Sequence, residues 1–391
     1  VLLLNIGALI DLSFVKDYSF GAVMILWQGG MESGNAAADL LCGKVTPCGH
    51  LTDTVADCYE AYPSASCFGN PKANEYREDI YVGYRWFETF HREQVRYPFG
   101  YGLSYTSFTV TGTHTDPLGF RAEVTNTGKH PGKAVVMLFV EKPCGVLGNP
   151  ARELVAFGKT RLLSPGQSQS LSFSVTEYQL SSYDDSGLTG HKACYVLQQG
   201  AYRFYCGENV RDTQFIGDYM VPELRVLRSL SEACAPKKSF PIWANENGTP
   251  VCREASARTV DLRQRILDHL PKAVSQTGDQ GIQLLDVKEG KASLEDFVAQ
   301  LSLEELEAIS RGAYNMDSPL GARGNAGVFG GVTQSLRDKG VSPVTTTDGP
   351  SGIRLYWPRS PTAALASMPN ALDRSPLSTS PRRTPLIHTE V

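Results

Sequence analysis

The alternation of apolar and polar residues between 106 and 210 is the feature that most constrains the fold. Residues 120–125 alternate strictly, as a strand with one buried face requires, and the turn residues of 126–128 follow them directly. Further strands are indicated over 134–140, 171–175 and 200–205. Short strands divided by turns predict a β-sandwich. We expect residues 106–210 to fold alone.

The start of the chain has a different pattern. Residues 1–6 and 21–27 are continuous apolar runs, which are typical of parallel strands buried on both faces. The turn Gln28-Gly29-Gly30 follows the second run, and the small residues of 34–41 suit a helix packed closely on a sheet. Strand, glycine turn and helix predict an α/β domain. A chain that opens inside a buried strand, without an initiating Met, looks cut.

Aromatic residues and glycine crowd the segment 59–105. Aromatic side chains bury a large area at a low cost in conformational entropy. We therefore interpret this segment as a packed seam between domains rather than as a ligand-binding surface.

The last 180 residues divide into three parts. We expect 211–290 to be a linker with one or two helices, one of them near 257–270. Two capping boxes, Ser293–Asp296 and Ser302–Glu305, predict a pair of helices, and 341–347 reads as a strand. Frequent proline predicts that 357–391 is an unstructured tail.

Composition excludes several classes of partner. The 391 residues carry a net charge of −4, which gives no electrostatic case for nucleic acid or for an anionic membrane. No apolar run is long enough to span a membrane. The nine cysteines contain no CxxC pair, so we expect no metal site, no cofactor and a cytoplasmic protein. The sequon at Asn247 would matter only after secretion. A homo-oligomer stays possible.

Four parts of the chain together resemble glycoside hydrolase family 3. They are 26–47, 76–85 with 97–105, 153–166, and the loop Thr347-Asp348-Gly349-Pro350-Ser351-Gly352-Ile353-Arg354. The resemblance implies a multidomain α/β plus β protein with three folded domains. They are the end of an α/β sandwich domain over 1–105, a fibronectin type III-like β-sandwich over 106–210, and the start of a (β/α)8 barrel over 291–356.

The order of these segments departs from the usual family order, in which the barrel comes first. It resembles the permuted β-glucosidases of the family, which implies hydrolysis of terminal β-linked glucose with retention. Such chemistry needs an Asp nucleophile and a Glu acid/base about 5–5.5 Å apart. The chain holds no Ser-Asp-Trp, the motif of the family nucleophile, and the family acid/base lies upstream of the segment that begins at Val1. We therefore assign no catalytic residue and expect the chain as given to be inactive.

Other activities stay open at this point. A β-xylosidase of the same family uses similar domains, and a non-catalytic carbohydrate-binding or scaffold protein could be built from the same modules. The expected small-molecule partner is a β-glucoside or a small β-linked oligosaccharide.

Asp348 and Arg354 are the two candidate substrate-binding residues. By the resemblance, the Asp of this loop accepts hydrogen bonds from sugar hydroxyls and the Arg lies beside it. A carboxylate offers lone pairs to neighbouring hydroxyls, and a guanidinium keeps it ionised. The alternative is a Gly-Pro turn whose Asp bonds its own backbone. We reject Glu32, as a helix N-terminal residue, and Glu78 with Asp79, as neighbours that would point to opposite faces of a strand.

Overall fold

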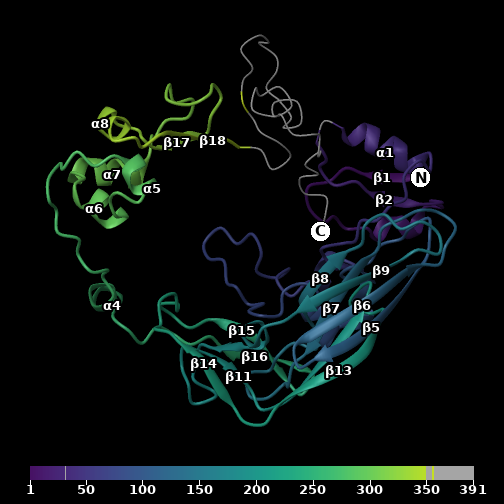
Figure 1. Ribbon diagram of the computed structural model, residues 1–391. Coiled ribbons are helices and arrows are strands. Elements are labelled where there is room, and N and C mark those ends of the chain that lie inside the picture. The colour runs from purple at the N-terminus through teal and green to yellow at the C-terminus, as the bar shows by residue number, and fades with distance from the viewer. Residues whose placement is uncertain (31, 349–354, 356–391) are drawn as a thin grey trace. The chain divides into compact units, whose positions relative to one another are not determined.

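The computed structural model describes residues 1–30, 32–348 and 355, and these residues form two compact units (Figure 1). One unit contains 1–27 and 35–265, and the other contains 28–34 and the residues from 266 onward. The expected tail, 357–391, lies outside the described residues. Within the described part of the chain, no helix combines the length and the apolarity needed to cross a membrane.

The first unit begins with a small α/β arrangement, as predicted. Strands β1 (Leu2–Leu4) and β2 (Val23–Ile25) pair in parallel, and helix α1 (Ser33–Leu41) follows. A second pair, β3 (Val55–Ala56) and β4 (Val95–Tyr97), is antiparallel. Leu4, Leu12 and Val55 are buried together in this part. Short 3-10 helices span Ser13–Asp17, Tyr59–Ala61 and Arg92–Gln94.

Three sheets make up the β-rich part of the first unit. The first has the order β13-β12-β7-β8, the second β5-β6-β9 and the third β10-β11-β14. Helix α3 (Glu177–Leu180) carries a full capping box between Thr176 and Gln179. The strands of the three sheets are β5 (Phe108–Asp116), β6 (Gly119–Asn126), β7 (Val135–Glu141), β8 (Glu153–Lys159), β9 (Ser168–Ser174), β10 (Ser182–Asp184), β11 (Cys194–Leu197), β12 (Gly200–Gly207), β13 (Thr213–Val221) and β14 (Arg225–Ser229).

Strand β7 is buried on both faces. Val136, Leu138 and Val140 point into the sandwich core, where they meet side chains of β6 and β12. The other side of β7 packs against Tyr84 and Phe99 of the aromatic segment. The aromatic segment, which contains helix α2 (Tyr84–Phe90), therefore forms the predicted seam against the sandwich.

Polar contacts hold the same seam. The backbone N–H of Leu154 donates to the Tyr84 hydroxyl at 2.9 Å. Glu88 is almost fully buried, and it accepts a hydrogen bond from Arg211 Nε at 2.8 Å. Because Arg211 neutralises this buried carboxylate, the pair joins α2 to the turn between β12 and β13.

The expected linker over 211–290 is wrong in its first half. Strand β13 pairs with β12 along its whole length, and β14 pairs with β11. Hairpin strands β15 (Pro241–Glu246) and β16 (Thr249–Glu254) follow. The pairing of β12 with β13 skips Ile216, so a bulge interrupts the two-residue period that would have revealed β13 in the sequence. Helices α4 (Leu262–Asp268) and α5 (Leu284–Lys288) agree with the one or two expected there.

The second unit is built mainly from short helices. Helices α6 (Leu294–Ala299), α7 (Leu303–Arg311) and α8 (Gln334–Asp338) follow α5. Phe297, Leu301, Ala308 and Leu336 are buried between them. The capping box at Ser302 is complete, whereas Ser293 caps α6 through its own side chain alone.

The two strands of this unit differ from the expected start of a barrel. Strands β17 (Gly327–Gly330) and β18 (Pro343–Thr346) pair antiparallel, whereas neighbouring strands of a (β/α)8 barrel are parallel. In the described residues, β17 and β18 thus form an antiparallel pair whose connection contains α8. The barrel itself stays an expectation from the resemblance.

The extent of β13 changes the prediction for the isolated sandwich. A fragment of residues 106–210 lacks β13, so one edge of β12 loses eight paired positions and the core loses Val221. We expect a fragment of residues 106–230 to unfold in one cooperative thermal transition followed by circular dichroism, and the 106–210 fragment to show none. Equal transition temperatures for the two fragments would contradict this assignment of the domain boundary.

Candidate substrate-binding site

Asp348 lies two residues beyond the end of β18. Its side chain is exposed, and the hydroxyl of the preceding Thr347 donates to the backbone carbonyl of Asp348 at 2.9 Å. Arg354, the second candidate residue, lies outside the described residues. The structure therefore presents the Asp348 carboxylate at the end of a strand and leaves its pairing with Arg354 a prediction.

The register of the hairpin fixes what lies beside Asp348. Thr346 pairs with Gly327, and the Thr346 hydroxyl donates to the Gly327 carbonyl at 2.9 Å. The N–H of Ala326 donates to the Thr346 carbonyl, also at 2.9 Å. Because the strands are antiparallel, the loop that precedes β17 lies at the same end of the hairpin as Asp348.

Asn325 organises this loop. Its side chain is buried, and its amide donates to the carbonyls of Ser318 at 3.0 Å and Ala322 at 2.7 Å. Its side-chain oxygen accepts from the Ser318 N–H at 3.1 Å. The loop places the exposed side chains of Tyr314 and Met316 on its surface. Residues 321–331 are rich in glycine, and an Asn among glycines is the sequence signal for a side chain that satisfies the backbone of a turn.

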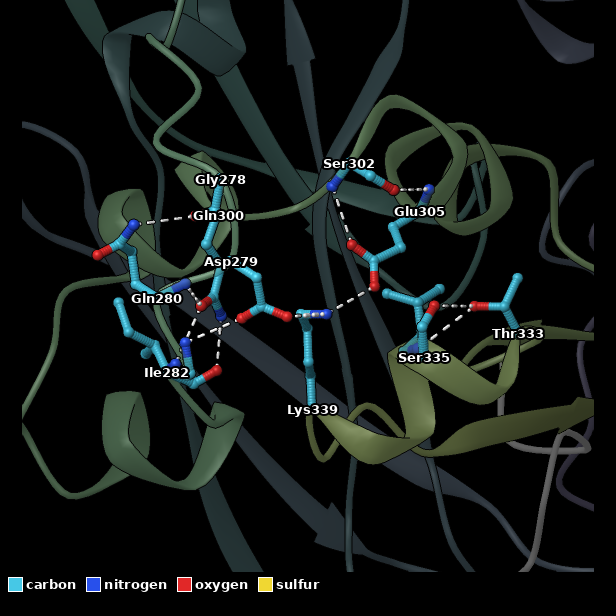
Figure 2. A network of polar contacts seen from close by, with 12 residues as sticks. Gly278, Asp279, Gln280, Ile282, Gln300, Ser302, Glu305, Thr333, Ser335 and Lys339 are labelled. Atoms are coloured by element: carbon cyan, nitrogen blue, oxygen red, sulfur yellow. Dashed lines mark hydrogen bonds and ion pairs between the residues drawn. The ribbon is translucent and has the colours of Figure 1, made fainter.

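A second polar cluster surrounds Lys339, between α8 and β18 (Figure 2). The Lys339 ammonium lies 2.9 Å from Glu305 Oε1 on α7 and 3.0 Å from Asp279 Oδ2. Glu305 also accepts the N–H of Ser302 at 2.9 Å, as part of the capping box. Lys339 therefore joins three chain segments at one point, and the sequence pattern revealed only the cap.

Burial and charge act against each other on Glu305. Burial favours the neutral acid, but the hydrogen bonds from Lys339 and from the Ser302 N–H outweigh it, so the pKa of Glu305 is lowered. The pKa of Asp279 is lowered by the Gly281 N–H and by Lys339. The two carboxylates raise the pKa of Lys339 in return, Glu305 more than Asp279. All three groups are charged at neutral pH.

The amide of Gln300 extends this cluster (Figure 2). Its oxygen accepts the N–H groups of Gln280 at 3.1 Å and Ile282 at 2.9 Å, and its nitrogen donates to the Ile282 carbonyl. Gln300 is almost fully buried at the end of α6. Its side chain therefore provides the 280–282 loop with backbone hydrogen bonds of the kind that a helix or a strand would provide.

The carboxylates rejected as catalytic residues occupy structural positions. Glu32 directly precedes α1, as expected for a residue at a helix N-terminus. Glu78 and Asp79 lie in a turn, so the strand argument used against them was wrong. Burial raises the pKa of Glu78 and of Asp79, and a second carboxylate, Asp185, adds to the rise at Asp79. No group of His, Cys, Asp and Glu among the described residues is arranged to hold a metal ion.

Comparisons with known proteins assign parts of the chain to known domain families. Residues 1–105 match the glycosyl hydrolase family 3 C-terminal domain, and residues 134–210 match the fibronectin type III-like domain. The chain is 42% identical to a beta-glucosidase of Ruminococcus albus over 91% of this chain and 38% of the relative. It is 37% identical to beta-glucosidase A of Butyrivibrio fibrisolvens over 91% of this chain and 47% of that relative. The chain therefore contains the C-terminal domain of glycoside hydrolase family 3, followed by a fibronectin type III-like domain.

Solved structures give the same result. A beta-glucosidase from Paenibacillus barengoltzii superimposes with a TM-score of 0.84 at 45% identity, over 93% of this chain and 41% of that one. Beta-glucosidase 3B of Thermotoga neapolitana, in complex with α-D-glucose, superimposes with a TM-score of 0.51 at 35% identity, over 58% of this chain and 32% of that one. The chain spans less than half the length of these proteins. The three relatives that cover 91–93% of this chain match it along both compact units.

The contacts of Lys339 predict that replacing this residue lowers the stability of the second unit. In Lys339→Met, the buried Glu305 loses its charged partner, which we expect to cost about 2–3 kcal/mol of unfolding free energy for the second unit in urea. The exposed pair between Lys291 and Glu289 provides the control, and Lys291→Met should change nothing measurable.

The pH dependence of this loss follows from the lowered pKa of Glu305. A carboxyl group whose pKa is lowered on folding contributes stability above its ordinary pKa of 4.5, and this stability disappears as the pH falls through the lowered value. The difference between wild type and Lys339→Met should therefore be full at pH 7 and should shrink below about pH 4. A difference that stays constant down to pH 2 would refute the ion pair as its cause.

Proposed function

We propose that this chain contributes to a β-glucosidase that releases glucose from β-glucosides with retention. The observation that carries the proposal is the identity of 42% to a beta-glucosidase along 91% of the chain, which includes the loop at Asp348. The named relatives reported above are all beta-glucosidases, which favours this activity over that of a β-xylosidase or a non-catalytic scaffold.

Within this proposal, Asp348 and Arg354 hold the sugar. Asp348 is exposed after the end of β18, and a carboxylate can accept hydrogen bonds from two neighbouring hydroxyls of a glucose ring. By the same resemblance, Arg354 is the second contact in this loop. Both residues bind and orient the substrate, and neither one attacks the anomeric carbon or transfers a proton to the leaving group.

The nucleophile and the acid/base come, in this proposal, from sequence outside the printed chain. The printed sequence has no Ser-Asp-Trp, and Glu78 and Asp79 lie in a turn of the first unit. A retaining mechanism needs both carboxyl groups close to one glycosidic bond. The printed chain therefore supplies contacts to the sugar without the groups that break the bond.

The printed chain by itself should not hydrolyse an aryl β-glucoside. Loss of the nucleophile and the acid/base removes most of the catalysis in enzymes of this type. The measurement is release of the chromophore relative to a protein-free sample. Turnover that is abolished by replacing a single carboxylate of the chain would overturn the assignment of both catalytic groups to other sequence.

The role of Asp348 can be tested in a chimera that adds the flanking segments of the Ruminococcus albus relative. There we expect Asp348→Ala to lower kcat/KM by about ten-fold to several-hundred-fold, because a charged hydrogen bond to the substrate is lost. Asp338, an exposed carboxylate on α8, is the matched control, and Asp338→Ala should keep normal kcat/KM. Near-normal kcat/KM in folded Asp348→Ala would show that Asp348 only forms a turn.

A further inference from the structure

The tip of the β15–β16 hairpin carries the one Asn-Gly pair in the sequence, Asn247-Gly248. Glu246 and Thr249 pair across the hairpin, so these two residues form the whole loop. Both have positive φ, 52° for Asn247 and 85° for Gly248, as a type I′ turn requires. The Asn247 side chain is exposed to solvent.

An Asn-Gly pair has a defined spontaneous chemistry. The backbone nitrogen of the glycine loses its proton and attacks Cγ of the asparagine, a five-membered succinimide forms, and ammonia leaves. Water then opens the ring to aspartate or isoaspartate. The glycine lacks a Cβ that would obstruct the attack, so the reaction depends on whether the nitrogen can reach Cγ with its proton released.

The structure shows what restrains this step. The Gly248 N–H donates to Oδ1 of Asn245 at 2.7 Å. Asn245 is itself nearly fully buried, and its side-chain amide donates to the Asn149 carbonyl at 3.3 Å. The acceptor is therefore fixed by the neighbouring 143–149 loop as well as by the turn. While this contact holds, the proton of the nucleophilic nitrogen is held in a hydrogen bond to Asn245.

We propose that Asn247 is a site of deamidation through a succinimide and that the Asn245 side chain restrains the reaction by holding the Gly248 N–H. Asn247 lines a hollow of about 500 Å³ together with Glu141 and Arg203. Deamidation places a new carboxylate in this hollow, which Glu141 also lines, and next in sequence to Glu246. Isoaspartate also adds a backbone atom to the turn, which a two-residue hairpin loop cannot accommodate without a change in register.

The test follows the mass of the peptide that contains Asn247 while the full chain is kept at pH 8 and 37 °C. Asn245→Ala removes the acceptor and should speed the gain of one mass unit about two- to ten-fold, the factor that corresponds to one lost hydrogen bond. Asn245→Asp keeps an acceptor oxygen for the Gly248 N–H but cannot donate to the Asn149 carbonyl, so its rate should fall between those of wild type and Asn245→Ala. The chain unfolded in urea gives the unrestrained rate, and wild type should be slower than this reference.

A control variant separates the hydrogen bond from general loosening of the hairpin. Arg253→Ala removes the 2.8 Å pair between Arg253 and Glu246 on the same hairpin but leaves the Gly248 N–H bonded to Asn245. Its rate should match wild type. Equal acceleration in Arg253→Ala and Asn245→Ala would attribute the rate to fraying and overturn the proposal, as would a wild-type rate equal to that of the unfolded chain.

Discussion

The first unit depends on the burial of β7 from both sides. Alternate residues of this strand face the sandwich core and the aromatic segment, so one run of apolar residues belongs to two cores at once. A fully buried apolar side chain contributes roughly 1.5–3 kcal/mol to stability. Removal of either neighbour would expose about half of the strand. The aromatic segment therefore adds to the stability of the β-sandwich, and both lie in one compact body.

Polar contacts refine this arrangement. Glu88 with Arg211 and Tyr84 with Leu154 fix the direction in which α2 crosses the sandwich, because hydrogen bonds demand a definite geometry that apolar packing does not. Asn245 has the same effect on the hairpin tip, where its side chain contacts the backbone of both Gly248 and Asn149. In each case a buried polar group is satisfied by a segment that is distant in sequence.

The carboxylates of the second unit differ in their surroundings along the chain. Before the strand, Glu305 and Asp279 are paired with Lys339 and are held in place by helix caps and loops. After the strand, Asp348 is exposed. A carboxylate that already accepts an ammonium and backbone N–H groups has few lone pairs left for a ligand. These contacts give Glu305 and Asp279 a structural role.

The sequence by itself determined the features that local patterns encode. Alternation in β6 and β9, continuous apolar runs in β1, β2 and β7, and the cap at Ser302 were all visible, because burial of one face or of both leaves a period in the residues. The loop at Asp348 was visible only through its resemblance to a known family. The Asn247-Gly248 pair is also a sequence signal for a tight turn, but the β15–β16 hairpin was not predicted from it.

Only the tertiary structure decided the rest. The bulge at Ile216 hides β13, because one extra residue shifts every later side chain to the other face. The partners of Lys339, Glu88 and Asn245 come from distant segments, and no local period records which buried charge or amide will meet which backbone group. The antiparallel pairing of β17 with β18 likewise depends on how the chain returns through α8. Local sequence fixes which faces must be buried, whereas the folded chain fixes which groups satisfy one another there.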